Sequence, residues 1–163
     1  MSYVPWFRSN PTPSPVIVMR GISGSGKSTL AHKMAKELRA VVVSADDFFM
    51  RSGRYEFDPS KLSLAHGQSF RRAIEAAQAG RAIIVDNTNT TISEIAPYML
   101  LAQAYDRPAR IITVQCEIEA GVSRTRHGVP RAGIERMHAT LAAETKKMPP
   151  WWEHEEVGPD FCP

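Results

Sequence analysis

Residues 21–29, with the sequence GISGSGKST, constrain the fold of this chain more than any other feature. They match the pattern G-x-x-x-x-G-K-[ST] of a phosphate-binding loop at every fixed position. The apolar run VIVM at residues 16–19 is typical of a buried strand. After the loop, Leu30, Met34 and Leu38 recur at helical spacing. Because such a loop requires a strand, a glycine-rich turn and a helix in this order, the sequence predicts a site for a nucleoside triphosphate.

This loop is expected to bind ATP together with Mg²⁺. Its glycines allow successive backbone N–H groups to converge on phosphate oxygens, and the following helix adds its positive N-terminal end. Lys27 is expected to reach the β- and γ-phosphates, and the Ser28 hydroxyl is expected to be a ligand of Mg²⁺. The residues expected to contact the nucleotide are Gly21, Ser23, Gly24, Ser25, Gly26, Lys27, Ser28 and Thr29.

Short apolar runs alternate with helical patterns along the rest of the chain. Further strands are expected at residues 40–43, 82–85 and 110–114. Strands that alternate with helices imply right-handed crossovers and a parallel sheet that is covered on both sides. The predicted fold class is therefore a three-layer α/β P-loop NTPase or kinase fold, with a mostly parallel sheet, helices on both faces and a short lid.

The helices are expected to begin and end at recognisable signals. Asp58 and Pro59 are typical of a helix start, and that helix is expected to stop at Gly80. Thr91 and Glu94 have the spacing of a capping box. Pro97 predicts a kink or a restart of this helix, because proline lacks the N–H that the helix interior needs. A short helix is expected around residues 118–122, and a last one from residue 130 to before residue 149.

The length of 163 residues suits one domain with a substantial core. Residues 1–15 contain four prolines together with Trp6 and Phe7, and they are expected to form an extended arm. Residues 16–148 are expected to be the kinase domain. Residues 149–163 are expected to be a C-terminal tail, whose acidic part from Glu153 onward has no periodicity.

Composition excludes some classes of protein. A hydrophobic content of 43% and a charged content of 23% are those of a globular chain. The net charge of +3 is compatible with a polyanionic partner without establishing one. Cys116 and Cys162 have neither metal-ligand nor disulfide spacing, which favours a reduced, cytoplasmic location. No run of 18 apolar residues and no apolar signal core occurs, so neither a membrane span nor a secretion signal is expected.

Carboxylates follow two of the predicted strands, at the edge where an α/β sheet presents its functional loops. Asp46 is expected to be the base that takes the proton of an acceptor hydroxyl, whereas Asp47 is expected to be structural. Asp86 is expected to organise Mg²⁺ or its water, or the lid. The alternative for Asp46 and Asp86 is that each caps a turn, as aspartate often does.

Arg124 and Arg126 precede Gly128 in a segment whose composition is typical of a hinge. Arginines on a mobile lid would neutralise the charge that develops on a transferring phosphoryl group. The alternative is a solvated basic turn. The spacing of His66, His127 and His138 indicates neither a metal site nor a catalytic triad, and these side chains are expected to be structural or exposed to solvent.

Several blocks of sequence occur together in a known family. The chain resembles the P-loop kinases that include polynucleotide 5′-hydroxyl kinases and the kinase domains of Bcl-3- and NEDD4-binding proteins. The resemblance covers roughly residues 16–141, and the SADD, VDNTN and HGVP blocks are more specific than the phosphate-binding loop. The matching segments are residues 21–31, 44–49, 57–66, 83–90, 97–98 and 124–130.

The resemblance implies a role for several residues. It makes Asp46 the general base, assigns Lys27 and Ser28 to ATP and Mg²⁺, and places Arg124 and Arg126 in the lid. In phage polynucleotide kinase, an arginine shortly after the base binds the substrate phosphate. Arg51 has a similar position after Asp46 in this sequence. The residues expected to bind the acceptor are Asp46, Arg51, Arg54 and Asn87.

The acceptor is expected to be a nucleic acid, most simply a polynucleotide 5′-hydroxyl end. Basic and aromatic side chains that alternate after Asp46 suit phosphates and stacked bases, namely Phe48, Phe49, Arg51, Arg54, Tyr55, Phe70, Arg71 and Arg72. The rings could instead be core beneath a long loop. The alternative functions are a kinase of hydroxymethylated pyrimidines in DNA, a small-molecule or nucleotide-sugar kinase, and a non-catalytic NTP-binding module. The sequence does not indicate an oligomeric state.

Overall fold

A computed structural model describes residues 13–158 of the chain. The expected N-terminal arm, residues 1–15, lies almost entirely outside these described residues. Within the described range, no helix combines the length and the apolar character that crossing a membrane requires.

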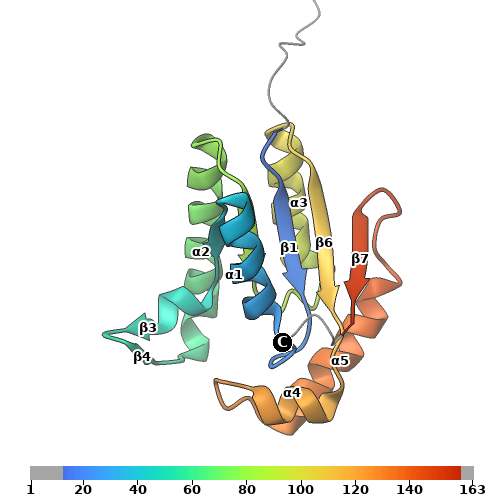
Figure 1. Cartoon of the computed structure of the whole chain (residues 1–163). Coiled ribbons are helices and arrows are strands. Elements are labelled where there is room, and N and C mark those ends of the chain that lie inside the picture. Colours follow the sequence, from blue (N-terminus) through green and yellow to red (C-terminus); the bar gives the residue numbers. More distant parts are fainter. Residues whose placement is uncertain (1–12, 159–163) are drawn as a thin grey trace, which may run out of the picture.

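Five parallel strands form one sheet in the order β2-β5-β1-β6-β7 (Figure 1). β1 is central and pairs in parallel with β5 on one side and β6 on the other. The strands are β1 (Val16–Arg20), β2 (Val41–Val43), β5 (Ile83–Asp86), β6 (Ala109–Val114) and β7 (Glu153–Val157). The predicted α/β fold class is therefore confirmed.

Helices cover both faces of the sheet, and Figure 1 shows α1 and α3 on opposite sides of it. The larger helices are α1 (Lys27–Leu38), α2 (Leu62–Gln78), α3 (Ile92–Ala104) and α5 (Arg131–Thr145). Side chains of β1 alternate between the two layers, as the geometry of a strand requires. Val16 and Val18 pack in the cluster formed with α2 and α3, whereas Ile17 and Met19 pack against α1.

Most residues that were predicted to begin helices do so in the structure. The Asp58 side chain accepts from the Ser60 backbone N–H at 3.0 Å, beginning a single 3-10 turn, η2 (Pro59–Lys61), that leads into α2. The capping box of Thr91 and Glu94 starts α3. α3 then continues through Pro97 as one helix, so the expected restart does not occur. The absence of a backbone N–H at Pro97 therefore does not break α3 into two helices.

The expected C-terminal tail contains a fifth strand, which corrects the prediction that its acidic part is irregular. Glu153–Val157 pairs in parallel with β6 at the edge of the sheet. His154 bonds the Thr113 hydroxyl at 2.8 Å, and Val157 packs against the α1 side of the core. Charged side chains are common on edge strands, where they discourage pairing with further strands. Because these residues are charged, the segment lacks the apolar pattern by which strands are predicted from sequence.

Several short elements lie at the carboxyl end of the sheet (Figure 1). A 3-10 turn, η1 (Asp46–Phe49), follows β2 and leads into a hairpin of β3 (Met50–Arg51) and β4 (Arg54–Tyr55). α4 (Ile118–Arg124) follows β6 and packs on α5 through a small apolar cluster that includes Ile118 and Ile134. Residues 118–130 are called the lid segment below.

Fully buried Arg20 connects the end of β1 to two other elements. Its guanidinium donates to the carbonyl oxygens of Asn89 at 3.1 Å, Thr90 at 3.0 Å and Leu141 at 3.1 Å. The Asn89 amide donates in turn to the Met19 carbonyl at 2.6 Å. These bonds hold the loop after β5 and helix α5 against the strand that leads into the phosphate-binding loop.

Candidate active site

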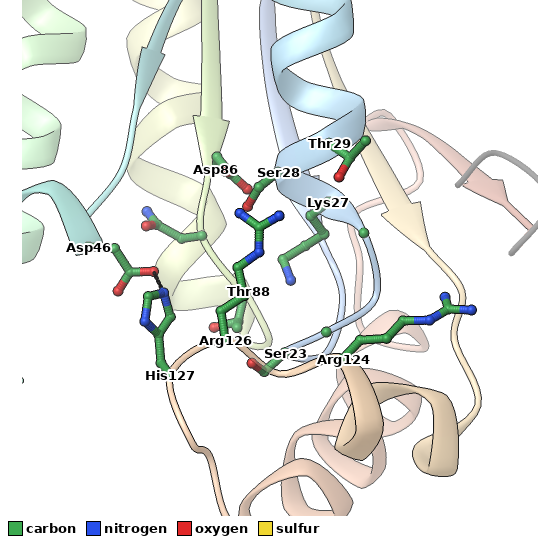
Figure 2. Close-up of a pocket in the computed structure, with 13 residues that line it drawn as sticks. Ser23, Lys27, Ser28, Thr29, Asp46, Asp86, Thr88, Arg124, Arg126 and His127 are labelled. Carbon is green, nitrogen blue, oxygen red and sulfur yellow. Dashed lines mark ion pairs between the residues drawn. The ribbon is translucent and has the colours of Figure 1, made fainter. Parts of the chain in front are cut away.

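A cavity of about 450 Å³ opens at the carboxyl end of the sheet, over the N-terminus of α1 (Figure 2). Its lining comes from the loop before α1, the segments after β2 and β5, and the lid segment. The lining residues are Ser23, Gly24, Gly26, Lys27, Ser28, Thr29, Asp46, Asp86, Asn87, Thr88, Arg124, Arg126 and His127. The sequence-predicted loop, both carboxylates and both lid arginines therefore meet in one cavity.

Glycines shape the phosphate-binding loop at two positions where other residues would not fit. Gly24 has a φ of 78°, and a Cβ there would collide with the backbone of Gly121 in α4. Gly26 has a φ of 92° and precedes the first turn of α1. L-residues with a side chain rarely adopt these left-handed conformations. The close approach of Gly24 to Gly121 also brings the lid segment directly onto the loop.

Lys27 is buried at the floor of the cavity, with 7% of its surface exposed. Its ammonium donates to the Ile22 carbonyl at 2.7 Å and lies 3.5 Å from the Ser25 hydroxyl. Burial lowers the pKa of Lys27 to about 8, although the nearby charges of Asp86 and Asp46 oppose the shift. The ammonium is thus poorly solvated, which favours binding of an anion beside it.

Ser28 and Asp86 form a candidate magnesium site. Asp86 is buried at the end of β5, and the Ser28 hydroxyl is hydrogen-bonded to its carboxylate. Burial raises the pKa of Asp86, and the Ser28 bond and the Lys27 charge counteract this shift. Magnesium in nucleotide sites takes one or two protein oxygen ligands beside water and phosphate oxygens, so this pair of oxygens fits the ion.

Asp46 stands on the opposite side of the cavity, in the first turn after β2. The Asn87 side-chain oxygen accepts from the Ala45 N–H at 2.8 Å, which joins the segment after β2 to the segment after β5. Asp47 points elsewhere and pairs with Arg72 of α2, as its predicted structural role requires. The Asp46 side chain remains 54% exposed, so a molecule that enters the cavity can reach it.

The lid arginines differ in direction. In Figure 2, Arg126 projects toward Lys27 and Asp86, whereas Arg124 projects away from them. The Ser23 and Thr125 hydroxyls lie 3.0 Å apart, which ties the lid segment to the phosphate-binding loop between the two arginines. Arg126 is therefore the better placed of the two to contact a phosphate held by Lys27.

Some sequence-predicted residues lie outside the cavity lining. Arg51 and Arg54 are exposed on the β3–β4 hairpin and do not line the cavity. Gly21 and Ser25 belong to the loop but do not line the cavity. Ser25 is buried beside Lys27.

The predicted basic and aromatic acceptor surface is only partly present. Phe49 is buried beneath the hairpin, Phe70 packs edge-on against Tyr98 of α3, and Arg72 is engaged by Asp47. The alternative that several of these rings are core is therefore correct for Phe49 and Phe70. Arg51 and Arg54 remain exposed on the hairpin.

Three residues make contacts at the site that the sequence did not predict. His127 was expected to be structural or exposed, but its Nε2 lies 3.6 Å from Asp46 Oδ2. Tyr55 donates a hydrogen bond to Asp46 Oδ1 at 2.9 Å. Thr88 lines the cavity, and its carbonyl accepts from the Gly21 N–H at 3.0 Å. The HGVP and VDNTN blocks contain His127 and Thr88, and Tyr55 was grouped with the acceptor-side rings, but no sequence signal predicted these contacts.

Comparison with known proteins gives the family. A family model described as "AAA domain" matches residues 16–144. Human NEDD4-binding protein 2 is 39% identical over 92 residues, which are 55% of this chain and 5% of that protein. The bifunctional polynucleotide phosphatase/kinase of Schizosaccharomyces pombe is 28% identical over 104 residues, 64% of this chain and 22% of that protein. The chain thus matches only a small part of either relative.

Solved structures show the same fold. A chain of the Pnkp1/Rnl/Hen1 RNA repair complex superposes with a TM-score of 0.72 and 21% identity, over 86% of this chain and 48% of that one. A sugar kinase from Janibacter sp. HTCC2649 superposes with a TM-score of 0.62 and 22% identity, over 92% of this chain and 87% of that one. These likenesses concern the fold alone.

Proposed function

Because the chain belongs to the AAA domain family and is a P-loop kinase related to polynucleotide kinases, we propose that it phosphorylates a polynucleotide 5′-hydroxyl with ATP. The observation that carries this proposal is the placement of Asp46 and Lys27 on opposite sides of one cavity. An exposed carboxylate that faces a phosphate-binding loop is the arrangement that transfer to a hydroxyl requires.

Several side chains of the cavity have a role in the proposed reaction. The loop N–H groups and Lys27 hold the phosphates, and Arg126 adds positive charge from the lid segment. Asp46 orients the acceptor hydroxyl toward the γ-phosphate and takes its proton. Magnesium held by Ser28, with Asp86 beside it, would neutralise charge on the β- and γ-phosphates.

The acceptor can be identified by labelling. The full chain is incubated with γ-labelled ATP, Mg²⁺ and separate acceptors: 5′-hydroxyl DNA and RNA oligonucleotides, DNA that contains hydroxymethyluracil, gluconate and other polyols. Label at oligonucleotide 5′ ends supports the proposal. Label within hydroxymethyluracil DNA that already carries a 5′-phosphate would assign the enzyme to modified bases, and label on a polyol alone would assign it to small molecules.

Arg51 and Arg54 are expected to bind acceptor phosphates outside the cavity. The change of both to alanine should weaken acceptor binding and spare acceptor-free ATP hydrolysis, because neither residue lines the ATP cavity. Two lost contacts to a single strand should reduce the slope of log affinity against log salt by about 1.4. Fluorescence anisotropy of a labelled oligonucleotide at several salt concentrations measures this slope.

The matched control removes the same charge elsewhere. Lys33 and Lys36 are exposed on α1, and the change of both to alanine should leave the salt slope near that of the wild type. Equal effects of the two double variants would show that net charge, and not the hairpin, determines binding.

Arg126→Ala is expected to lower kcat by about 10²-fold with little change in ATP affinity, because Arg126 projects toward Lys27 and Asp86, where the transferring phosphate is proposed to lie. Arg124→Ala should have the smaller effect on kcat, since that side chain projects away. Steady-state kinetics with labelled ATP, together with calorimetric titration of a non-hydrolysable ATP analogue, separates the two quantities. The reverse order of effects would contradict the assignment.

A further inference from the structure

Three side chains from three separate segments meet at the mouth of the cavity. Asp46 follows β2, Tyr55 ends the hairpin strand β4, and His127 belongs to the lid segment. Asp46 Oδ1 accepts from the Tyr55 hydroxyl at 2.9 Å, and Asp46 Oδ2 lies 3.6 Å from His127 Nε2 (Figure 2). Asp46 is thus contacted by the hairpin on one side and by the lid segment on the other.

The two contacting side chains also touch each other. The rings of Tyr55 and His127 stack with centroids 3.8 Å apart and an interplanar angle of 27°. Tyr55 is in turn held by two rings that flank the hairpin, because Phe57 stacks on it at 6.3 Å and Phe49 meets it edge-on at 6.1 Å. Phe49 is buried, so this row of rings connects the lid segment to the core through His127.

On the basis of the proposed function, we propose that Tyr55 and His127 are positioning residues that clamp the lid segment to the hairpin and orient Asp46 for proton transfer. The Tyr55 hydroxyl fixes one carboxylate oxygen. The second oxygen is not within hydrogen-bond distance of His127, so it can accept the proton of an acceptor hydroxyl. The lid segment also carries Arg126, so the clamp brings this arginine into the cavity together with the oriented base.

The ionisation of Tyr55 agrees with this role. Burial and the hydrogen bond to Asp46 raise the pKa of the phenol above its ordinary value. Tyr55 therefore remains a hydrogen-bond donor to Asp46 throughout the neutral range. Gly128, with a φ of 63°, follows His127 and allows the chain to turn at the point where the lid segment meets the hairpin.

The experiment separates the hydroxyl from the ring stack. Tyr55→Phe removes only the hydroxyl, His127→Ala removes the stacked ring, and His127→Phe restores a ring without the charge-bearing nitrogen. His138→Ala is the control, because His138 is exposed on α5 away from the hairpin. Hydrogen exchange of the hairpin amides, residues 50–56, is measured in the ligand-free full chain, and kcat and KM are measured with labelled ATP and the acceptor found above.

Tyr55→Phe is expected to lower kcat about tenfold with unchanged ATP affinity and unchanged hairpin exchange. His127→Ala is expected to lower kcat and also to speed hairpin exchange about two- to tenfold, since a stacked pair is lost. His127→Phe should restore slow exchange, and His138→Ala should match the wild type in both measurements.

Two results would overturn the inference. Hairpin exchange in His127→Ala at the wild-type rate would show that no clamp exists, and wild-type kcat in Tyr55→Phe would show that the hydroxyl does not orient Asp46. If the wild type phosphorylates no acceptor, the proposed function and the orienting role fail together. The exchange measurement still decides the clamp in that case, because it needs no substrate.

Discussion

Asp46→Asn is expected to lower the rate of phosphoryl transfer by about 10²- to 10⁴-fold, the usual cost of removing a general base. The amide has nearly the shape of the carboxylate and can still accept the Tyr55 hydrogen bond through its oxygen, but it cannot take a proton. ATP affinity should be retained, because Asp46 lies across the cavity from the phosphate-binding loop. Single-turnover kinetics with labelled ATP and calorimetric titration of an ATP analogue measure the two effects.

Asp47→Asn is the matched control for this variant. Asp47 is the adjacent carboxylate, but it pairs with Arg72 at the surface and does not line the cavity. Loss of an exposed ion pair costs at most about 1 kcal/mol of stability, so activity should stay near that of the wild type. A nearly active Asp46→Asn beside an inactive Asp47→Asn would show that the two carboxylates have the opposite roles.

The parts of the site that could be predicted from the sequence depend on local patterns. The residues around Lys27 follow a fixed spacing, and the alternation of apolar strands with helices determines that the ends of β1, β2 and β5 share one edge of the sheet. That edge brings Asp46 and Asp86 to the loop without any knowledge of side-chain contacts. For the same reason, the predicted bounds of β1, β2, β5 and β6 differ from those in the structure by no more than one residue at any end.

The parts that could not be predicted depend on contacts between distant residues. His127 and Asp46 are 81 positions apart in the sequence, and no spacing rule relates a lid residue to a base after β2. The edge strand β7 forms because β6 offers it a backbone partner, while its own side chains are largely charged. Phe70 and Phe49 were grouped with Tyr55 by composition, although only the packing of α2 and η1 determines which ring reaches the cavity mouth.

Lys27→Ala is expected to lower phosphoryl transfer by about 10²- to 10³-fold, the usual cost of losing one preorganised charged group around a reacting phosphate. In the ligand-free protein the ammonium is buried and its pKa is lowered to about 8, so folding gains nothing from its charge there. Phosphate oxygens of bound ATP would stabilise the charged ammonium. The charge of Lys27 is therefore expected to matter for the complex with ATP and not for the stability of the fold. Steady-state labelling and calorimetric titration of an ATP analogue measure the rate and the affinity.

Circular dichroism should show that Lys27→Ala has a thermal unfolding midpoint close to that of the wild type. The variant loses the hydrogen bonds to the Ile22 carbonyl and the Ser25 hydroxyl, but it also loses the unfavourable burial of a charge. Lys36→Ala is the matched control, since Lys36 is exposed further along the same helix. It should keep full activity. Wild-type turnover in Lys27→Ala would remove the phosphate-binding loop from the mechanism, whereas an unfolded Lys27→Ala would show that the buried ammonium supports the fold instead.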